Sequence, residues 1–197
     1  GMTLFFVVYF RLLHHPLFPI TIMPLTAVDR LIPFQPEALL IYVSLWFYVS
    51  LPPALLTDRR ELWSYLMAAT VLCVIGCGFF LFWPTAVPAF PLDSTRDSFF
   101  SVLQKVDASG NACPSLHVAF AVFTACWMQR LLRQLNAGVL AHAGNWLWCA
   151  GILYSTIATR QHVAIDVAAG ALLGAVVAVC HLRLQRERAV LRVNQAA

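Results

Sequence analysis

The chain has 197 residues, of which 60% are hydrophobic and only 11% are charged, and its formal net charge is +4. A soluble domain of this length cannot bury so much apolar surface in one core. The composition therefore excludes an ordinary soluble protein and predicts an integral membrane protein. We expect one domain over residues 2–197, with Gly1 as an added residue before Met2. We expect no nucleic-acid partner, and the sequence does not indicate an oligomeric state.

Membrane spans can be read from length, because a helix needs about 20 residues to cross about 30 Å of hydrocarbon. A first apolar segment, residues 2–18, is interrupted by Arg11, His14 and His15; it could be a short span, an interfacial helix or the remainder of a truncated one. Five clearer candidates follow in chain order: residues 38–56, 62–83, 114–132, 145–160 and 162–182. The sequence therefore predicts an all-α fold, a bundle of about six transmembrane helices.

The basic residues indicate how this bundle is oriented. If successive connections alternate sides, one side receives eight of the thirteen Lys and Arg residues: Arg59, Arg60, Arg130, Arg133, Arg183, Arg186, Arg188 and Arg192. By the positive-inside rule this side is cytoplasmic, and residues 183–197 form a basic cytoplasmic tail. Asp29, Arg30 and Glu37 belong to the other side, where we expect them to be solvated loop charges.

Other features of the apolar segments predict packing rather than chemistry. The six cysteines show neither the spacing of a disulfide framework nor a Cys/His cluster for zinc, so we expect small core thiols and no metal site. Gly170 and Gly174 form a small-residue face in the last span, which is typical of close helix packing.

Ionisable groups within a membrane segment are costly unless they have a function. His162 and Asp166 are four residues apart in an expected helix, so they share a face and the carboxylate can accept a hydrogen bond from the imidazole. The other ring nitrogen would then point outward as a nucleophile. Arg160 lies just before His162 and could neutralise the negative oxygens of its target.

A second polar segment, Pro114-Ser115-Leu116-His117, begins another expected span at the same extracytoplasmic boundary. Proline suits the first turn of a helix, whose exposed amides and dipole form an anion site. Ser115 could add a hydroxyl donor, and His117 is placed to protonate a leaving oxygen. The two segments together offer a nucleophile, an orienting acid, a proton donor and a phosphate site.

These segments resemble motifs of the type 2 phosphatidic acid phosphatase (PAP2) superfamily. Its Pro-Ser-Gly-His motif appears as Pro114-Ser115-Leu116-His117, and its Ser-Arg-x5-His-x3-Asp motif appears as Ser155-Thr156-x5-His162-x3-Asp166. The Leu and Thr variants are similar to the branch that contains inositol phosphorylceramide and sphingomyelin synthases and related bacterial membrane proteins. The resemblance covers at least residues 62–182. It implies a six-helix fold with no cofactor and a metal-independent site, in which His162 forms a phosphohistidine, Asp166 is its partner and His117 releases the alcohol.

Two parts of the family pattern differ in this chain. The first motif, Lys-x6-Arg-Pro, is absent in that form, and its nearest candidate, Trp83-Pro84-Thr85, has no basic residue. Thr156 stands where the third motif has arginine. We expect Arg160 first, and then Arg96 or Lys105, to supply the phosphate-binding charges.

The resemblance implies a membrane lipid phosphatase that hydrolyses a lipid phosphomonoester or pyrophosphate at the extracytoplasmic face, with the bacterial inner membrane as the expected location. One alternative is a lipid phosphotransferase that moves a phospho-headgroup to the alcohol of an acceptor lipid. Another is a membrane transporter or inactive scaffold that is not an enzyme. The sequence does not indicate which lipid is the substrate.

Overall fold

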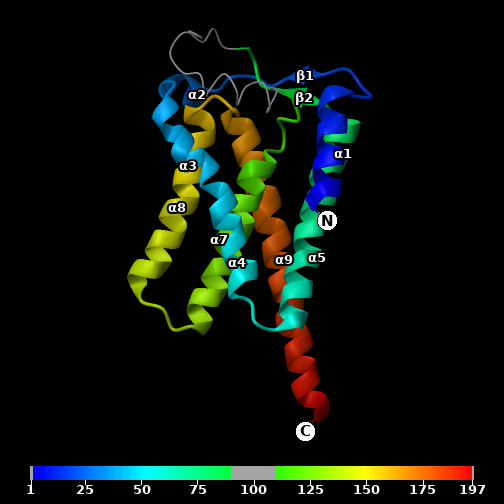
Figure 1. Ribbon diagram of the computed structural model, residues 1–197, viewed down its shortest axis with the longest axis vertical. Coiled ribbons are helices and arrows are strands. Elements are labelled where there is room, and N and C mark those ends of the chain that lie inside the picture. The colour runs from blue at the N-terminus through cyan, green and yellow to red at the C-terminus, as the bar shows by residue number, and fades with distance from the viewer. Residues whose placement is uncertain (1, 90–109, 197) are drawn as a thin grey trace.

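The computed structural model describes residues 2–89 and 110–196 and shows a helical bundle with a two-stranded sheet at one end (Figure 1). Its helices are α1 (Met2–His14), α2 (Ala27–Leu31), the 3-10 helix η1 (Pro36–Ala38), α3 (Leu39–Val43), α4 (Leu45–Leu55), α5 (Arg59–Phe82), α7 (Leu116–Gln134), α8 (Val139–Ala158) and α9 (Ala164–Ala196). The strands are β1 (Thr21–Ile22) and β2 (Thr85–Ala86), which pair in parallel. The expected all-α membrane fold is confirmed, whereas the pair of strands was not predicted.

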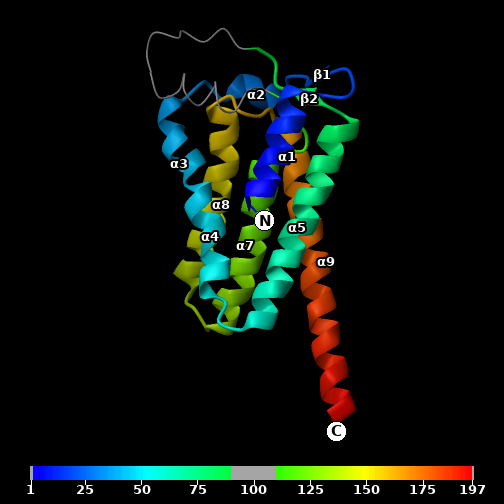
Figure 2. The ribbon, with the colours of Figure 1, turned by 45° about the vertical axis from the view of Figure 1, so that its right-hand side comes forward.

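Within the described residues, three helical segments are long and apolar enough to cross a membrane: Pro36–Leu55, Arg59–Phe82 and Ala164–Glu187. They correspond to three of the five clearer candidates from the sequence. The other two candidates fall on α7 and α8, which run beside these spans in the bundle (Figures 1 and 2). Helix α1 has 13 residues and therefore rises about 20 Å, less than the hydrocarbon thickness of about 30 Å.

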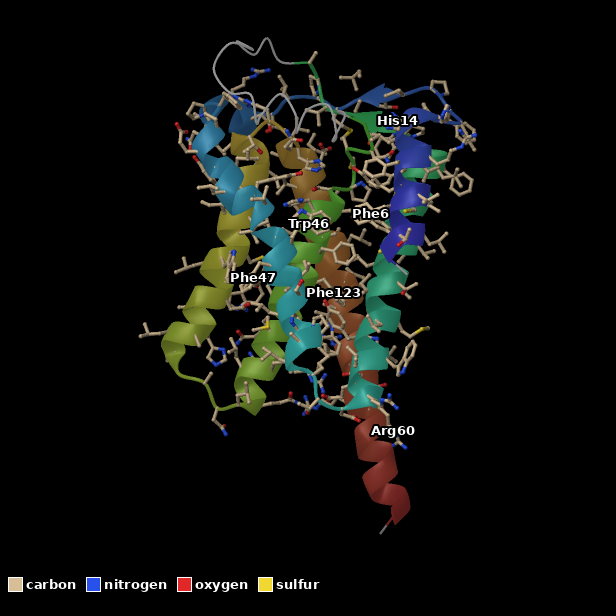
Figure 3. All side chains as sticks on the ribbon, viewed as in Figure 1. Phe6, His14, Trp46, Phe47, Arg60 and Phe123 are labelled. Carbon is tan, nitrogen blue, oxygen red and sulfur yellow. The ribbon has the colours of Figure 1, made fainter. Side chains whose placement is uncertain are left out.

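Helix α7 occupies the centre of the bundle and packs against α4, α5, α8 and α9. Val118, Phe123 and Trp127 on this helix are fully buried, and Figure 3 shows Phe123 in the interior between the helices. A helix surrounded by other helices is shielded from lipid, so it does not need the uniformly apolar surface of an outer span. This position explains why α7 is more polar than the three apolar spans.

The expected small-residue face joins α9 closely to α7. A side-chain carbon at Gly170 would meet the backbone of Ser115, and one at Gly174 would meet the backbone of Ala119. The two helices can approach this closely only because residues 170 and 174 have no side chain, as in small-xxx-small packing of membrane helices. The close approach brings the beginning of α7 against the beginning of α9.

The two ends of the bundle differ in their contents. Helix α2 and both strands lie at one end, and Arg60 and the C-terminal half of α9 lie at the other (Figures 1 to 3). At this second end Arg130 of α7 forms an ion pair with Glu61 of α5 and donates a hydrogen bond of 2.8 Å to Gln185 Oε1 of α9. The polar segments singled out from the sequence belong to the first end.

Two helices are longer than the sequence predicted. Helix α9 continues to Ala196 rather than ending near residue 182, because its basic tail contains Leu, Gln, Arg, Glu and Ala, which favour helix although they end the apolar stretch. Helix α8 begins at Val139 rather than at residue 145, because His142, Gly144 and Asn145 lower the apolarity of its first turns without interrupting the helix.

Candidate active site

The first turns of α7 and α9 contact each other directly. The Ser115 amide donates a hydrogen bond of 3.1 Å to the Asp166 carbonyl oxygen, and Gly170, one turn further along α9, lies against the Ser115 backbone. The two polar segments identified in the sequence are therefore in contact, although more than 40 residues separate His117 from His162 in the chain.

His162 and Asp166 face each other at the start of α9. His162 Nδ1 lies 3.6 Å from Asp166 Oδ2, which is longer than a hydrogen bond. Asp166 is fully buried, and its Oδ2 accepts a hydrogen bond of 3.1 Å from the Val163 amide. Among the described residues, neither His162 Nδ1 nor Asp166 Oδ1 has a hydrogen-bond partner. A small movement of the imidazole would close the expected hydrogen bond.

His117 is held by Tyr42 of α3. The two rings are stacked, with centroids 3.9 Å apart and planes inclined by 9°, and His117 Nε2 lies 3.0 Å from the Tyr42 carbonyl oxygen. Because a carbonyl oxygen can only accept, Nε2 is the protonated nitrogen of His117 in this contact. His117 and His162 are also close enough for a charge on one to oppose a charge on the other.

The turn between α8 and α9 places His162. Arg160 in this turn has a positive φ of 59°, a left-handed conformation that is uncommon outside glycine. Its guanidinium donates to the carbonyl oxygens of Asp29 and Ile32 over 2.7 and 3.0 Å. The arginine that we expected to bind phosphate thus lies two residues from His162 and also contacts the backbone of the α2 segment.

Asp29 is buried, so the expectation that it is a solvated loop charge was wrong. It is 2% exposed; Oδ2 accepts hydrogen bonds from the Thr26 amide and hydroxyl, both of 2.7 Å, and Oδ1 accepts one of 2.8 Å from the Ala164 amide. The carboxylate is buried because it caps the first amides of two helices, α2 and α9. Arg30 and Glu37 are exposed, as expected.

The other expected phosphate ligands differ in what the structure shows of them. Ser115 is the N-cap of α7; it is fully buried, and its Oγ accepts a hydrogen bond of 3.3 Å from the Val118 amide. Arg96 and Lys105 lie outside the described residues.

Thr85 of β2 fixes the chain just before the α7 motif. Its Oγ1 accepts a hydrogen bond of 2.7 Å from the Cys113 amide, and the side chain is 1% exposed. Pairing of Thr85 with Thr21 anchors this contact to β1. Burial, and then the neighbouring Asp166 carboxylate, raise the pKa of Cys113 to about 11, so this cysteine remains a neutral thiol near pH 7.

Sequence reasoning therefore missed three residues that hold the site: Asp29, Tyr42 and Thr85. Thr85 belongs to the segment identified as the nearest candidate for the first motif, so its place in the sequence could have indicated that it lies near the site. Asp29 and Tyr42 belong to no motif, and their contacts with α9 and α7 could not be read from the chain.

Metal-binding groups are not gathered in the described part of the chain. No cluster of three or more His, Cys, Asp and Glu side chains is found there, and all six cysteines are free thiols.

The fold defines a helical membrane protein, in which two histidines and a buried aspartate lie near the starts of two adjacent helices. The PAP2 superfamily profile matches residues 60–189, and the chain belongs to this superfamily. Its members are generally phosphatases or phosphotransferases. Comparisons with curated proteins and with solved structures found no match. The matched range contains both motif segments, whereas Asp29 and Tyr42 precede it.

Proposed function

We propose that this protein is a membrane lipid phosphatase that hydrolyses a lipid phosphomonoester or pyrophosphate through a phosphohistidine. The observation that supports it best is the placement of His162 over Asp166, beside His117, where α7 and α9 meet. Membership of a superfamily of phosphatases and phosphotransferases supports the reaction class.

In the first step His162 Nε2 attacks the phosphorus, because Nδ1 is the nitrogen that faces Asp166. The bond from Nε2 to phosphorus forms as the bond from phosphorus to the leaving oxygen breaks. The imidazole then becomes positively charged, and the buried Asp166 carboxylate stabilises that charge and keeps the ring oriented.

His117 supplies the proton that the leaving oxygen needs. Its Nε2 proton is donated to the Tyr42 carbonyl oxygen, so in the protonated imidazole Nδ1 holds the proton that can be transferred. In the second step a water molecule gives a proton back to His117 while its oxygen attacks phosphorus, the bond to His162 breaks, and inorganic phosphate leaves.

The charge of the phosphoryl oxygens needs several donors. The N-terminal end of α7 favours an anion through the helix dipole. Arg160, whose guanidinium donates to the Asp29 and Ile32 carbonyl oxygens, adds a positive electrostatic potential two residues from His162 rather than a direct contact. Ser115 can donate its hydroxyl hydrogen to the phosphate while its oxygen accepts from the Val118 amide. Arg96 and Lys105 remain our candidates for further contacts.

The site is proposed to face the exterior of a bacterial cytoplasmic membrane. Its support is the separation of charge along the bundle: Arg60 and the basic part of α9 lie at the end opposite to α2 (Figure 3). By the positive-inside rule that end is cytoplasmic.

The first test measures phosphate release by the purified protein in detergent from a panel of lipid phosphates and pyrophosphates, with EDTA present. His162→Ala and His117→Ala are compared with His142→Ala, a histidine on α8 that contacts Gln129 and lies outside the proposed site. We expect release from the wild type and from the His142 variant, and loss in the other two. Activity that EDTA abolishes and Mg²⁺ restores would contradict the proposal.

A second substrate series isolates the role of His117. A general acid contributes about 10²- to 10⁴-fold when the leaving oxygen is a poor leaving group, so His117→Ala should lose far more activity on alkyl than on aryl phosphates. His162→Ala should lose both activities equally. If a new phospholipid appears only when an acceptor lipid is added, and no phosphate is released, the protein is instead a phosphotransferase.

A further inference from the structure

Residues on both sides of His162 are hydrogen-bonded to the same short segment, which begins at α2. On the N-terminal side, the Arg160 guanidinium donates to the carbonyl oxygens of Asp29 and Ile32. On the C-terminal side, the Ala164 amide donates to Asp29 Oδ1 over 2.8 Å. The two attached residues are each two positions from His162, so together they fix the turn that holds it.

The attachment continues along the end of α8. The Gln35 amide donates to the Ala158 carbonyl oxygen over 2.9 Å, and Tyr154 Oη donates to Gln35 Oε1 over 3.0 Å. Figure 1 shows α2 beside the end of α8 from which the turn to α9 begins. Residues 29–35 therefore follow the connection between α8 and α9 from Ala158 to Ala164.

We infer that Asp29 and Arg160 form a latch that positions His162 for attack on phosphorus. Asp29 is a positioning residue, and Arg160 acts on His162 through the backbone of the turn. The inference rests on the proposed function, because it assigns the latch to the nucleophile of that reaction.

The physical reason is the precision that the nucleophile needs. His162 Nδ1 stands 3.6 Å from Asp166 Oδ2, so a shift of a few tenths of an ångström decides whether the orienting hydrogen bond forms. The buried Asp29 carboxylate is well suited to hold the turn, since a carboxylate at a helix start is favoured by both the amide hydrogen bond and the dipole. Arg160 is itself the left-handed residue that turns the chain into His162, and the contacts of its guanidinium hold that turn.

The latch and direct phosphate binding by Arg160 predict different kinetics. A residue that positions the nucleophile acts on the chemical step, so its loss lowers kcat and leaves KM nearly unchanged. A residue that binds the phosphate in the ground state raises KM when it is removed. If the latch acts as a unit, removal of both members is also no worse than removal of one.

The experiment measures kcat and KM for Asp29→Ala, Arg160→Ala and the double variant, on the best lipid phosphate of the panel. Asp58→Ala is the matched control, because Asp58 also caps a helix, α5, by accepting from the Arg60 and Glu61 amides, but lies at the opposite end of the bundle. We expect kcat to fall about ten- to hundredfold in each latch variant and in the double variant, as for a misplacement of up to about 1 Å. KM should change by less than about twofold, and the control should match the wild type.

Hydrogen exchange gives a readout that does not depend on activity. Amides of residues 160–167 should exchange faster in Asp29→Ala, and also in Asp29→Asn if the alanine variant does not fold, but not in Asp58→Ala. Unchanged exchange there, unchanged kcat in Asp29→Ala, or a rise in KM confined to Arg160→Ala and additive with the Asp29 change, would overturn the latch. Full activity of His162→Ala would instead overturn the proposed function, so the two failures are distinguishable.

Discussion

Replacement of Gly170 or Gly174 by alanine is expected to push α9 away from α7. A methyl carbon at residue 174 would lie 3.0 Å from both the carbonyl carbon and the Cα of Ala119, and one at residue 170 would lie 3.2 Å from the carbonyl carbon of Ser115. Because carbon contacts are favourable at about 3.5–4.0 Å, the helices must separate by about 0.5 Å or more. Both obstacles are backbone atoms, which cannot rotate away.

The size of the effect follows from two opposing terms. Overpacking a close interface costs about 1–3 kcal/mol, while alanine in place of glycine inside a helix gains up to about 1 kcal/mol. We expect a net loss of about 1–2 kcal/mol for each variant, and for a chain of this length each kcal/mol lowers Tm by about 2–4 °C. Gly144→Ala is the control, because no atom lies within 4 Å of the added carbon, and it should be neutral or slightly stabilising.

Thermal unfolding in detergent and phosphate release are measured on the same preparations. Gly170→Ala should lower turnover roughly tenfold and should also lower stability. Residue 170 lies one turn after Asp166 and contacts Ser115, and the proposed site needs precise geometry. Gly174→Ala should lose similar stability but less turnover, since it lies one turn further from the site. If both variants behave like Gly144→Ala, the close approach of α7 and α9 does not hold the site, and the reasoning is refuted.

Two further substitutions test individual contacts. Tyr42→Leu removes a ring stack worth about 0.5–1.5 kcal/mol. Turnover of alkyl phosphates should therefore fall, while turnover of aryl phosphates changes little and Tyr42→Phe stays active. Equal losses on both substrates would show that the ring does not position His117. Asn145→Leu removes the side-chain partner of the Tyr48 hydroxyl and of the Ala125 carbonyl oxygen, and leaves the hydroxyl only its longer contact with the carbonyl oxygen of residue 145. It should lower stability by about 1–3 kcal/mol with turnover unchanged, and a fall in turnover at constant Tm would contradict this.

The sequence was sufficient for features that depend on residues near each other in the chain. Length and apolarity predicted the α5 span, and the spacing from His162 to Asp166 predicted that the two side chains lie close together. The expected helix was wrong for His162 itself, because α9 begins at Ala164 and His162 lies in the turn before it. Hydropathy was less informative for α7, because a helix enclosed by its neighbours can contain polar residues such as Gln129 and Arg130 that would be costly against lipid.

The remaining parts of the site depend on contacts between distant residues. Asp29 was interpreted as a solvated charge because its neighbours in the chain give no sign of the Ala164 amide, which is 135 positions away. The ring that stacks on His117 is likewise 75 positions away in α3. Such contacts are set by how the helices pack, and no local spacing or propensity specifies them.

The Asp29 carboxylate also has a consequence for the order of assembly. Synthesis and folding proceed from the N-terminus, so Asp29 is made long before Ala164, the amide it will cap. Until α9 joins the bundle, the Ala164 amide is not available to donate to Oδ1, so this oxygen must be hydrated instead. Arrival of α9 brings the Ala164 amide to Oδ1 and places His162 beside the start of α7, so the proposed site is complete only after α9 has been inserted.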